Sequence, residues 1–168
     1  MNINQFIVAP YSIPFVKPLQ TSGNNYTHRD GVWLNLKCEN YSGWGEAAPL
    51  AGFSEEDLKE VQYTLEGFHQ AIDGENIECD ELISLATVHT EGNPSARFAI
   101  ETALYDLFSQ KAEKPLSLYL NPQALTEITV NGITGIHMPG DGLNLMKVKV
   151  GFRNIFDEIE QMEMLTQS

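Results

Sequence analysis

The chain has 168 residues, which is enough for one domain with a hydrophobic core, or for one domain and part of a second. Hydrophobic residues make up 42% of the chain and charged residues 20%, so the composition is globular and argues against a disordered protein. Ten lysines and arginines stand against 23 aspartates and glutamates, and the net charge of −13 argues against nucleic acid or an anionic membrane surface as the main partner.

The N-terminal segment predicts a small antiparallel sheet of three strands. Residues 3–8 predict a short strand, and the polar residues 17–31 predict a mobile loop. Residues 32–38 alternate between apolar and other side chains, which is typical of a half-buried strand. After a turn, residues 44–48 return as its hairpin partner.

Helical periodicity begins after this sheet. Ser54 is predicted as an N-cap, because the acidic residues that follow it suit the positive end of a helix dipole, and Gly74 is the predicted stop. A second helix is predicted over 96–108, where small and apolar residues recur at helical spacing and indicate close packing on another element. Arg97 and Glu101 lie four residues apart and predict a surface ion pair. The apolar stripe of the first helix consists of Leu58, Val61, Leu65, Phe68 and Ile72.

From about residue 126 the pattern becomes that of the beginning of an α/β unit. Strands are predicted over 127–133 and 145–150, and a helix is predicted over 157–165. We therefore expect one domain over residues 1–125 and the start of a second over residues 126–168.

Lys147 and Lys149 are the candidate catalytic residues. They lie two apart on a predicted strand, so their side chains point to the same face. Two neighbouring ammonium groups lower the pKa of at least one of them, and burial lowers it further, which would allow a lysine to act as a base at neutral pH. The same spacing also fits the solvated face of an edge strand, where lysines discourage aggregation.

The segment GWGEAAPL, residues 43–50, and the four residues after it are the second feature. Its glycines and Pro49 fit the end of a strand with turn residues, or a compact loop that contacts a ligand. Glu46 has the same two interpretations, as a structural hydrogen-bond acceptor or as a ligand contact. The scattered histidines and aspartates do not form a spaced set of ligands, so no metal site is predicted.

The two cysteines, Cys38 and Cys79, form no CxxC pair and predict a reduced, cytoplasmic protein. The N-terminus lacks the basic region and the apolar run of a signal peptide, and no apolar stretch approaches the length of a membrane span.

The segment GWGEAAPLAGFSEEDL, residues 43–58, resembles the signature of the o-succinylbenzoate synthase family, with Ala51 in place of the more usual proline. HRDG, residues 28–31, resembles the entry to the second strand of that family. PSARFAIETALYDL, residues 94–107, resembles the main helix of its capping domain. KVKVG, residues 147–151, resembles the Lys-x-Lys motif on its second barrel strand. The matches follow the order of the family, which belongs to the enolase superfamily, and span nearly the whole chain.

The resemblance implies an α+β fold: an enolase-superfamily N-terminal capping domain, with an antiparallel three-stranded sheet plus helices, followed by the first strands of an incomplete (β/α) barrel. The implied reaction is the dehydration of 2-succinyl-6-hydroxy-2,4-cyclohexadiene-1-carboxylate to o-succinylbenzoate, in menaquinone biosynthesis, so the implied partner is a small-molecule carboxylate. Lys149 matches the general base that removes the proton next to the carboxylate, and Lys147 matches the lysine that assists through its charge. The segments that match the loops closing over the substrate contain Arg29, Gly52, Phe53 and Ser54.

The resemblance also implies Mg²⁺, which holds the substrate carboxylate and is bound by carboxylates on later barrel strands. A complete barrel needs about 250 residues, so we expect this chain alone to bind no catalytic Mg²⁺ and to turn over no substrate. Alternatives are a dipeptide epimerase or N-acylamino acid racemase of the same superfamily, a stand-alone capping-like domain that binds a partner, and a non-functional fragment. A barrel with only two strands would leave open strand edges, through which the chain could self-associate.

Overall fold

The structure, a computed structural model, describes residues 1–21, 24–133, 145–148, 150–151 and 153–166. The chain divides into two compact units, which are described separately. The first comprises Met1–Gln20 and Asn24–Ala124, and the second includes Leu125–Ser168.

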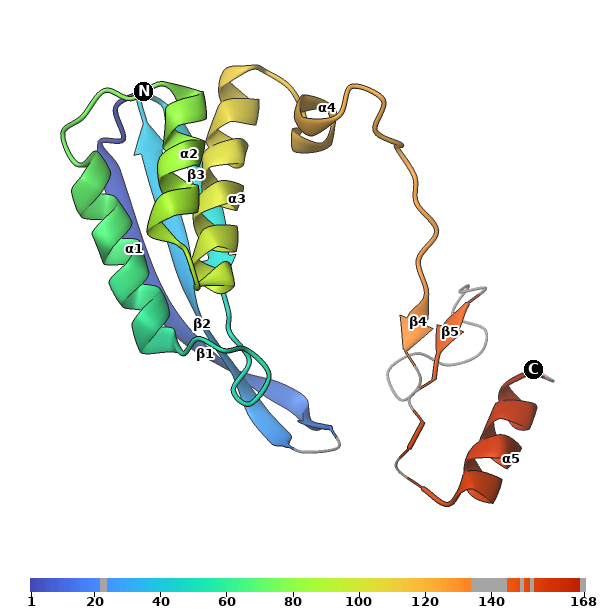
Figure 1. Cartoon of the computed structure of the whole chain (residues 1–168). Coiled ribbons are helices and arrows are strands. Elements are labelled where there is room, and N and C mark those ends of the chain that lie inside the picture. The colour runs from blue at the N-terminus through green and yellow to red at the C-terminus, as the bar shows by residue number, and fades with distance from the viewer. Residues whose placement is uncertain (22–23, 134–144, 149, 152, 167–168) are drawn as a thin grey trace. The chain divides into compact units, whose positions relative to one another are not determined.

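The first unit is built on an antiparallel sheet with the strand order β1–β2–β3 (Figure 1). Its strands are β1 (Gln5–Gln20), β2 (Asn25–Cys38) and β3 (Tyr41–Ala47). The predicted loop over residues 17–31 is wrong in its described part, because Leu19 pairs with Tyr26 and the β1–β2 hairpin continues almost to its turn. Most side chains near the β1–β2 turn are exposed, so no apolar face is needed there. Without the alternation of apolar and polar residues that marks a half-buried strand, the sequence did not indicate a strand in this part.

Three helices cover one face of the sheet (Figure 1). They are α1 (Leu58–Ile72), α2 (Cys79–His89) and α3 (Pro94–Lys111), and the short α4 (Leu116–Leu120) follows them. The predicted stripe of α1 is confirmed, since Val61, Leu65, Phe68 and Ile72 are all buried. They pack in one core with the strand residues Val32, Leu34, Leu36 and Cys38.

The N-cap of α1 is Asp57, so the prediction of Ser54 is wrong. Oδ1 of Asp57 accepts hydrogen bonds from the backbone N–H groups of Lys59 at 2.8 Å and Glu60 at 2.9 Å. The Glu60 carboxylate accepts in return from the backbone N–H of Asp57 at 2.8 Å, which completes a capping box. Ser54 thereby lies three residues before the N-cap, where it closes a turn instead.

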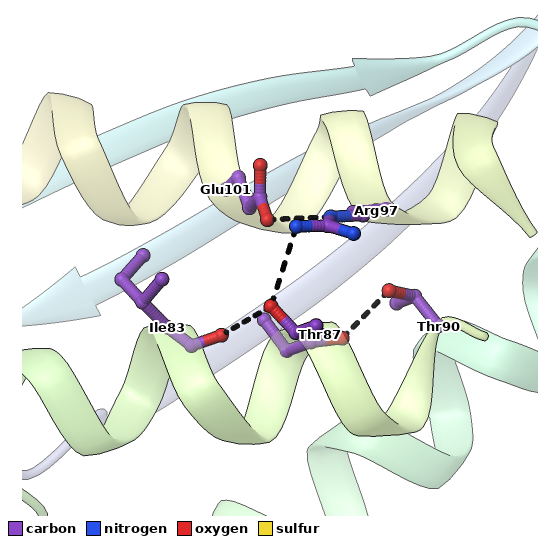
Figure 2. A network of polar contacts seen from close by, with 6 residues as sticks. Ile83, Thr87, Thr90, Arg97 and Glu101 are labelled. Carbon is purple, nitrogen blue, oxygen red and sulfur yellow. Dashed lines mark hydrogen bonds and ion pairs between the residues drawn. The ribbon is translucent and has the colours of Figure 1, made fainter.

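The sequence did not predict α2, whose fully buried stripe is limited to Leu82 and Ala86 and whose start has no side-chain cap. A polar bridge joins this helix to α3 (Figure 2). The Arg97 guanidinium donates to Glu101 at 2.7 Å, which confirms the predicted ion pair, and to the Thr87 hydroxyl on α2 at 3.4 Å. The bridge is exposed, so we expect it to contribute little to stability.

Helix α3 lies directly against β3, because both surfaces carry small residues. A Cβ atom placed on Gly43 would lie 2.0 Å from the carbonyl oxygen of Ala103, and one on Gly45 would lie 1.9 Å from that of Ala99. These glycines therefore lie inside β3 and permit close packing on a helix. The strand predicted over residues 44–48 is confirmed, and the interpretation of the two glycines as turn residues is wrong. The close packing predicted for the small residues of α3 is confirmed.

The outer edge of β3 is hydrogen-bonded to side chains of α3. The backbone N–H of Trp44 donates to the Asp106 carboxylate at 2.9 Å, and the Gln110 amide donates to the carbonyl of Ser42 at 2.9 Å. The helix thus satisfies backbone groups that an unpaired edge strand would present to other chains.

The second unit contains β4 (Gly132–Ile133), β5 (Met146–Lys147) and α5 (Ile155–Thr166). The two strands pair in parallel, as barrel strands do, but both are shorter than predicted. The predicted helix over 157–165 is confirmed. In the described part of the chain, no helix combines the length and apolarity needed to cross a membrane.

We expect Gly45→Ala to lower the free energy of unfolding by about 3 kcal/mol, because its methyl group would overlap the backbone of α3 and force the helix from the sheet. Urea unfolding followed by circular dichroism measures this. Gly67→Ala on α1 is the matched control: nothing lies within 4 Å of the added Cβ, so we expect it to stabilise by about 0.5–1 kcal/mol. Equal effects of the two substitutions would contradict the packing argument.

Candidate functional site

The candidate site is built around residues 48–57, which connect β3 to α1 and are called the β3–α1 segment below. Its central turn is closed on itself. The backbone N–H groups of Phe53 and Ser54 donate to the carbonyl of Leu50 at 2.9 and 2.8 Å, and the N–H of Leu50 donates to the Ser54 hydroxyl at 2.9 Å. Gly52 has a φ of 77°, in the left-handed region that glycine occupies without strain.

Two side chains of β2 hold the segment from outside. The Arg29 guanidinium donates to the carbonyls of Ala48 and Pro49, the latter at 3.3 Å, and the Tyr26 hydroxyl donates to the carbonyl of Ala51 at 2.7 Å. The structure therefore brings together the residues that the sequence predicted for the substrate loops, Arg29, Gly52, Phe53 and Ser54. Tyr26 was not predicted, because its role depends on the hairpin that the sequence did not reveal.

The turn presents the ring of Phe53 outward, with 85% of the residue exposed. Exposed apolar side chains are common singly on protein surfaces, so this exposure makes Phe53 available for a contact without identifying one. Ser54, by contrast, uses its hydroxyl within the turn, so its role here is structural.

Glu56 is the buried charge of the site, at 7% exposure. Its Oε1 accepts from the backbone N–H of Ser95 at 3.0 Å and from the Ser95 hydroxyl, in the first turn of α3. Burial raises the pKa of Glu56, but the hydrogen bonds from the Ser95 side chain and from the backbone of Glu56 and Ser95 together lower it below its ordinary value. The carboxylate is therefore ionised at neutral pH, and the positive end of the α3 dipole favours it.

The other oxygen of this carboxylate, Oε2 of Glu56, is buried and has no hydrogen-bond partner among the residues that the structure describes. The sequence did not single out Glu56, because it is one of three consecutive acidic residues, 55–57, that precede a helix. Only the position of α3, fixed by the packing on β3, distinguishes it from Glu55.

Glu46 accepts a hydrogen bond from the Tyr11 hydroxyl, which supports its interpretation as a structural acceptor. The Tyr11 ring reaches β3 by lying across Gly31 of the central strand, where an added Cβ would come within 2.3 Å of the hydroxyl oxygen. Burial, together with the hydrogen bond and the negative charge of Glu46, raises the pKa of Tyr11 to about 12. The contact joins all three strands on the face opposite the helices.

Two open hollows of about 530 Å³ each lie beside the β3–α1 segment and share Arg29, Ser54, Glu55 and Glu56. In the first, the ionisable residues are Arg29, Glu46, Glu55 and Glu56, so the lining has a net charge of −2. In the second, the charged residues are Arg29 and Lys59 against Asp30, Glu55, Glu56 and Asp57, which again gives −2 with His28 neutral. Both hollows therefore favour cationic over anionic groups.

The predicted catalytic lysines, Lys147 and Lys149, both fall in the second unit of the chain. Lys147 is an exposed residue of β5 in the second unit, and Lys149 lies outside the described residues. Their roles stay predictions. Within the described ranges, no group of three or more His, Cys, Asp and Glu residues is arranged to hold a metal ion.

Comparison with known proteins places this architecture among described families. The family "MenC, N-terminal domain" matches residues 3–107. The o-succinylbenzoate synthase of Haemophilus influenzae is 34% identical over 98 residues, which are 58% of this chain and 28% of that protein. The hydrophobic dipeptide epimerase of Enterococcus faecalis is 35% identical over 163 residues, 90% of this chain and 44% of that protein.

Among solved structures, the dipeptide epimerase of Enterococcus faecalis complexed with Mg and the dipeptide L-Leu-L-Tyr aligns with a TM-score of 0.80 at 26% identity. The alignment covers 99% of this chain and 50% of that one. The chain thus spans half or less of the length of these relatives. The fold class predicted from the sequence is confirmed: the sheet and helices form the N-terminal capping domain of an enolase-superfamily protein.

We expect Tyr26→Phe to loosen the β3–α1 segment without unfolding the first unit. The lost hydrogen bond to Ala51 is worth about 1 kcal/mol, so cleavage by chymotrypsin after Phe53 should become about fivefold faster. Tyr63→Phe, at an exposed position on α1, is the matched control and should leave the cleavage rate unchanged. A rate that does not respond to either change would show that the Tyr26 contact does not hold the turn.

The raised pKa of Tyr11 predicts a stability change in alkali. Because the pKa rises from 10.0 to about 12 on folding, the contribution is fully present below pH 10.0 and is lost as the pH rises from there toward 12. We expect urea unfolding of the Tyr11→Phe variant to lack this alkaline component. Glu46→Gln removes the neighbouring negative charge and should move the ionisation of Tyr11, followed by ultraviolet absorbance, back toward 10.0. An unchanged ionisation in Glu46→Gln would exclude the assigned contact.

Proposed function

Because the chain belongs to the family of MenC N-terminal domains, we propose that it forms the N-terminal part of an enolase-superfamily enzyme that removes a proton from the carbon next to a substrate carboxylate. The match over residues 3–107 is the observation that carries this proposal. The chain itself supplies the capping domain and the segment with the Lys-x-Lys motif.

Lys149 is the proposed base in this reaction. Its amine takes the proton as the C–H bond breaks, and the ammonium of Lys147 keeps the amine of Lys149 unprotonated beforehand by repulsion. The β3–α1 segment is the proposed contribution of the capping domain to the substrate site. Its closed turn and the two hydrogen-bonding side chains of β2 preorganise the backbone, and Phe53 excludes water from the bound substrate.

The first candidate reaction is that of o-succinylbenzoate synthase. After the proton passes to Lys149, the C–O bond of the ring hydroxyl breaks, and the leaving hydroxide takes that proton back from the Lys149 ammonium and departs as water, which completes the aromatic ring. The family match and the 34% identity to the Haemophilus influenzae enzyme support this candidate. A place in menaquinone biosynthesis and a cytoplasmic location belong with it.

The second candidate is the epimerisation of a dipeptide, in which the proton is removed from one face of the α-carbon and returned to the other. The relative from Enterococcus faecalis with this activity matches a longer part of the chain. The acidic lining of both hollows favours this candidate, because a dipeptide carries an ammonium group whereas o-succinylbenzoate and its precursor carry two carboxylates.

The magnesium ion seen in the related epimerase structure does not fit a site in the described part of this chain, which has no suitable cluster of ligands. No step above is therefore assigned to a metal.

The two candidates are separated by assaying the complete product of the gene in D₂O. Dehydration produces an aromatic ring that is followed by ultraviolet absorbance, whereas epimerisation introduces one solvent deuteron at the α-carbon of a dipeptide, which mass spectrometry detects. We expect one of these activities, and we expect Lys149→Arg to lower it about 10³-fold, as for the loss of a general base. Lys147→Met should have a smaller effect. Full activity of Lys149→Arg would refute the assignment of the base, and absence of both activities would refute the proposed function.

A further inference from the structure

We propose that Glu56, supported by Glu55, forms a binding subsite for a primary ammonium group in the first unit. The proposal rests on the proposed function for the identity of the ligand, which would be a substrate with a free amino group. The subsite itself is defined by residues of the first unit alone.

Only one of the two carboxylate oxygens of Glu56 accepts hydrogen bonds from the described residues. Oε1 is engaged by the backbone and hydroxyl of Ser95, whereas Oε2 is buried and has no hydrogen-bond partner in the ranges that the structure covers. A buried carboxylate oxygen without a donor is unfavourable by several kcal/mol unless a donor reaches it. The residue is more than nine-tenths buried and belongs to the lining of both hollows.

The surroundings favour a cation as that donor. Both linings have a net charge of −2, and Glu55 is an exposed member of both. Arg29 does not serve as the missing partner of Oε2, because its assigned hydrogen bonds go to the carbonyls of Ala48 and Pro49. The lowered pKa of Glu56 keeps the carboxylate charged at neutral pH.

The geometry favours an organic ammonium over a metal ion. A hard metal ion needs several oxygen ligands in a defined shell, and no such group occurs among the described residues. An ammonium group needs one charged acceptor and donates up to three hydrogen bonds, so Oε2 with a second carboxylate nearby suffices. Oε2 is not open to solvent, so binding must first displace part of the lining, and we expect weak affinity for a small probe.

The test is a titration of the chain followed by the amide resonances of Glu56 and Ser95 in nuclear magnetic resonance spectra. The three probes are L-Ala-L-Ala, N-acetyl-L-Ala-L-Ala and o-succinylbenzoate. The acetylated dipeptide has a neutral amide in place of the ammonium group. We expect L-Ala-L-Ala to shift both resonances and to bind at least about tenfold more tightly than the other two probes, as a charge-assisted hydrogen bond provides.

Glu56→Gln is the decisive variant, because its amide oxygen can still accept from Ser95 while the negative charge is lost. We expect it to weaken the binding of L-Ala-L-Ala at least about tenfold. Glu55→Gln, at an exposed position that the fold does not need, should weaken binding about threefold through the loss of a nearby charge. Glu75→Gln removes an exposed carboxylate that lines neither hollow and should leave the affinity unchanged.

Equal binding of the acetylated dipeptide, or unchanged binding by Glu56→Gln, would overturn the subsite and leave Glu56 with a structural role at the start of α3. Because this titration requires neither Lys149 nor a complete barrel, its result is independent of the enzymatic assay. Binding that depends on Glu56, together with an inactive complete protein, would support the subsite while refuting the proposed reaction.

Discussion

The backbone of α3 touches the backbone of β3, and the rest of the first unit depends on this contact. It exists because Gly43 and Gly45 face Ala99 and Ala103, so that no side chain separates helix from strand. The contact sets the position of the helix along the sheet. At one end it brings Asp106 to the edge of β3, and at the other it places the first turn of the helix beside Glu56. The packing of these four small residues thus fixes the position of Asp106, which covers the edge of β3, and of Ser95, which binds the buried carboxylate of Glu56.

The candidate site combines a rigid backbone with an excess of negative charge. The β3–α1 segment is closed by its own hydrogen bonds and held by two side chains of β2. The carboxylates around it outnumber the cations in both hollows, in line with the net charge of the chain. We expect a site of this kind to select ligands mainly by charge and by contact with Phe53, because its backbone has little freedom to adapt.

The sequence predicted the parts of the fold in which one face is apolar and the other polar. Strand β2, the stripe of α1 and the small residues of α3 have this character, and all three predictions hold. The end of the β1–β2 hairpin does not, because both its faces are exposed, and α2 buries too narrow a stripe to be recognised. Arg29, Gly52, Phe53 and Ser54 were predicted from a motif, whereas Tyr26 and Glu56 acquire their roles only from tertiary contacts, which no local pattern encodes.

The hydrogen bonds that hold the β3–α1 segment from β2 all end on main-chain carbonyls, those of Ala48, Pro49 and Ala51. Every amino acid supplies the same carbonyl, so these three contacts do not depend on the side chains at positions 48, 49 and 51, whereas Gly52 and Ser54 shape the turn through their residue types. Alanine at position 51, where the family signature that this segment resembles has proline, fits this tolerance. Mutations at such positions can change what a lineage of proteins recognises while the scaffold stays intact, which makes this short stretch a natural place for new specificities to evolve.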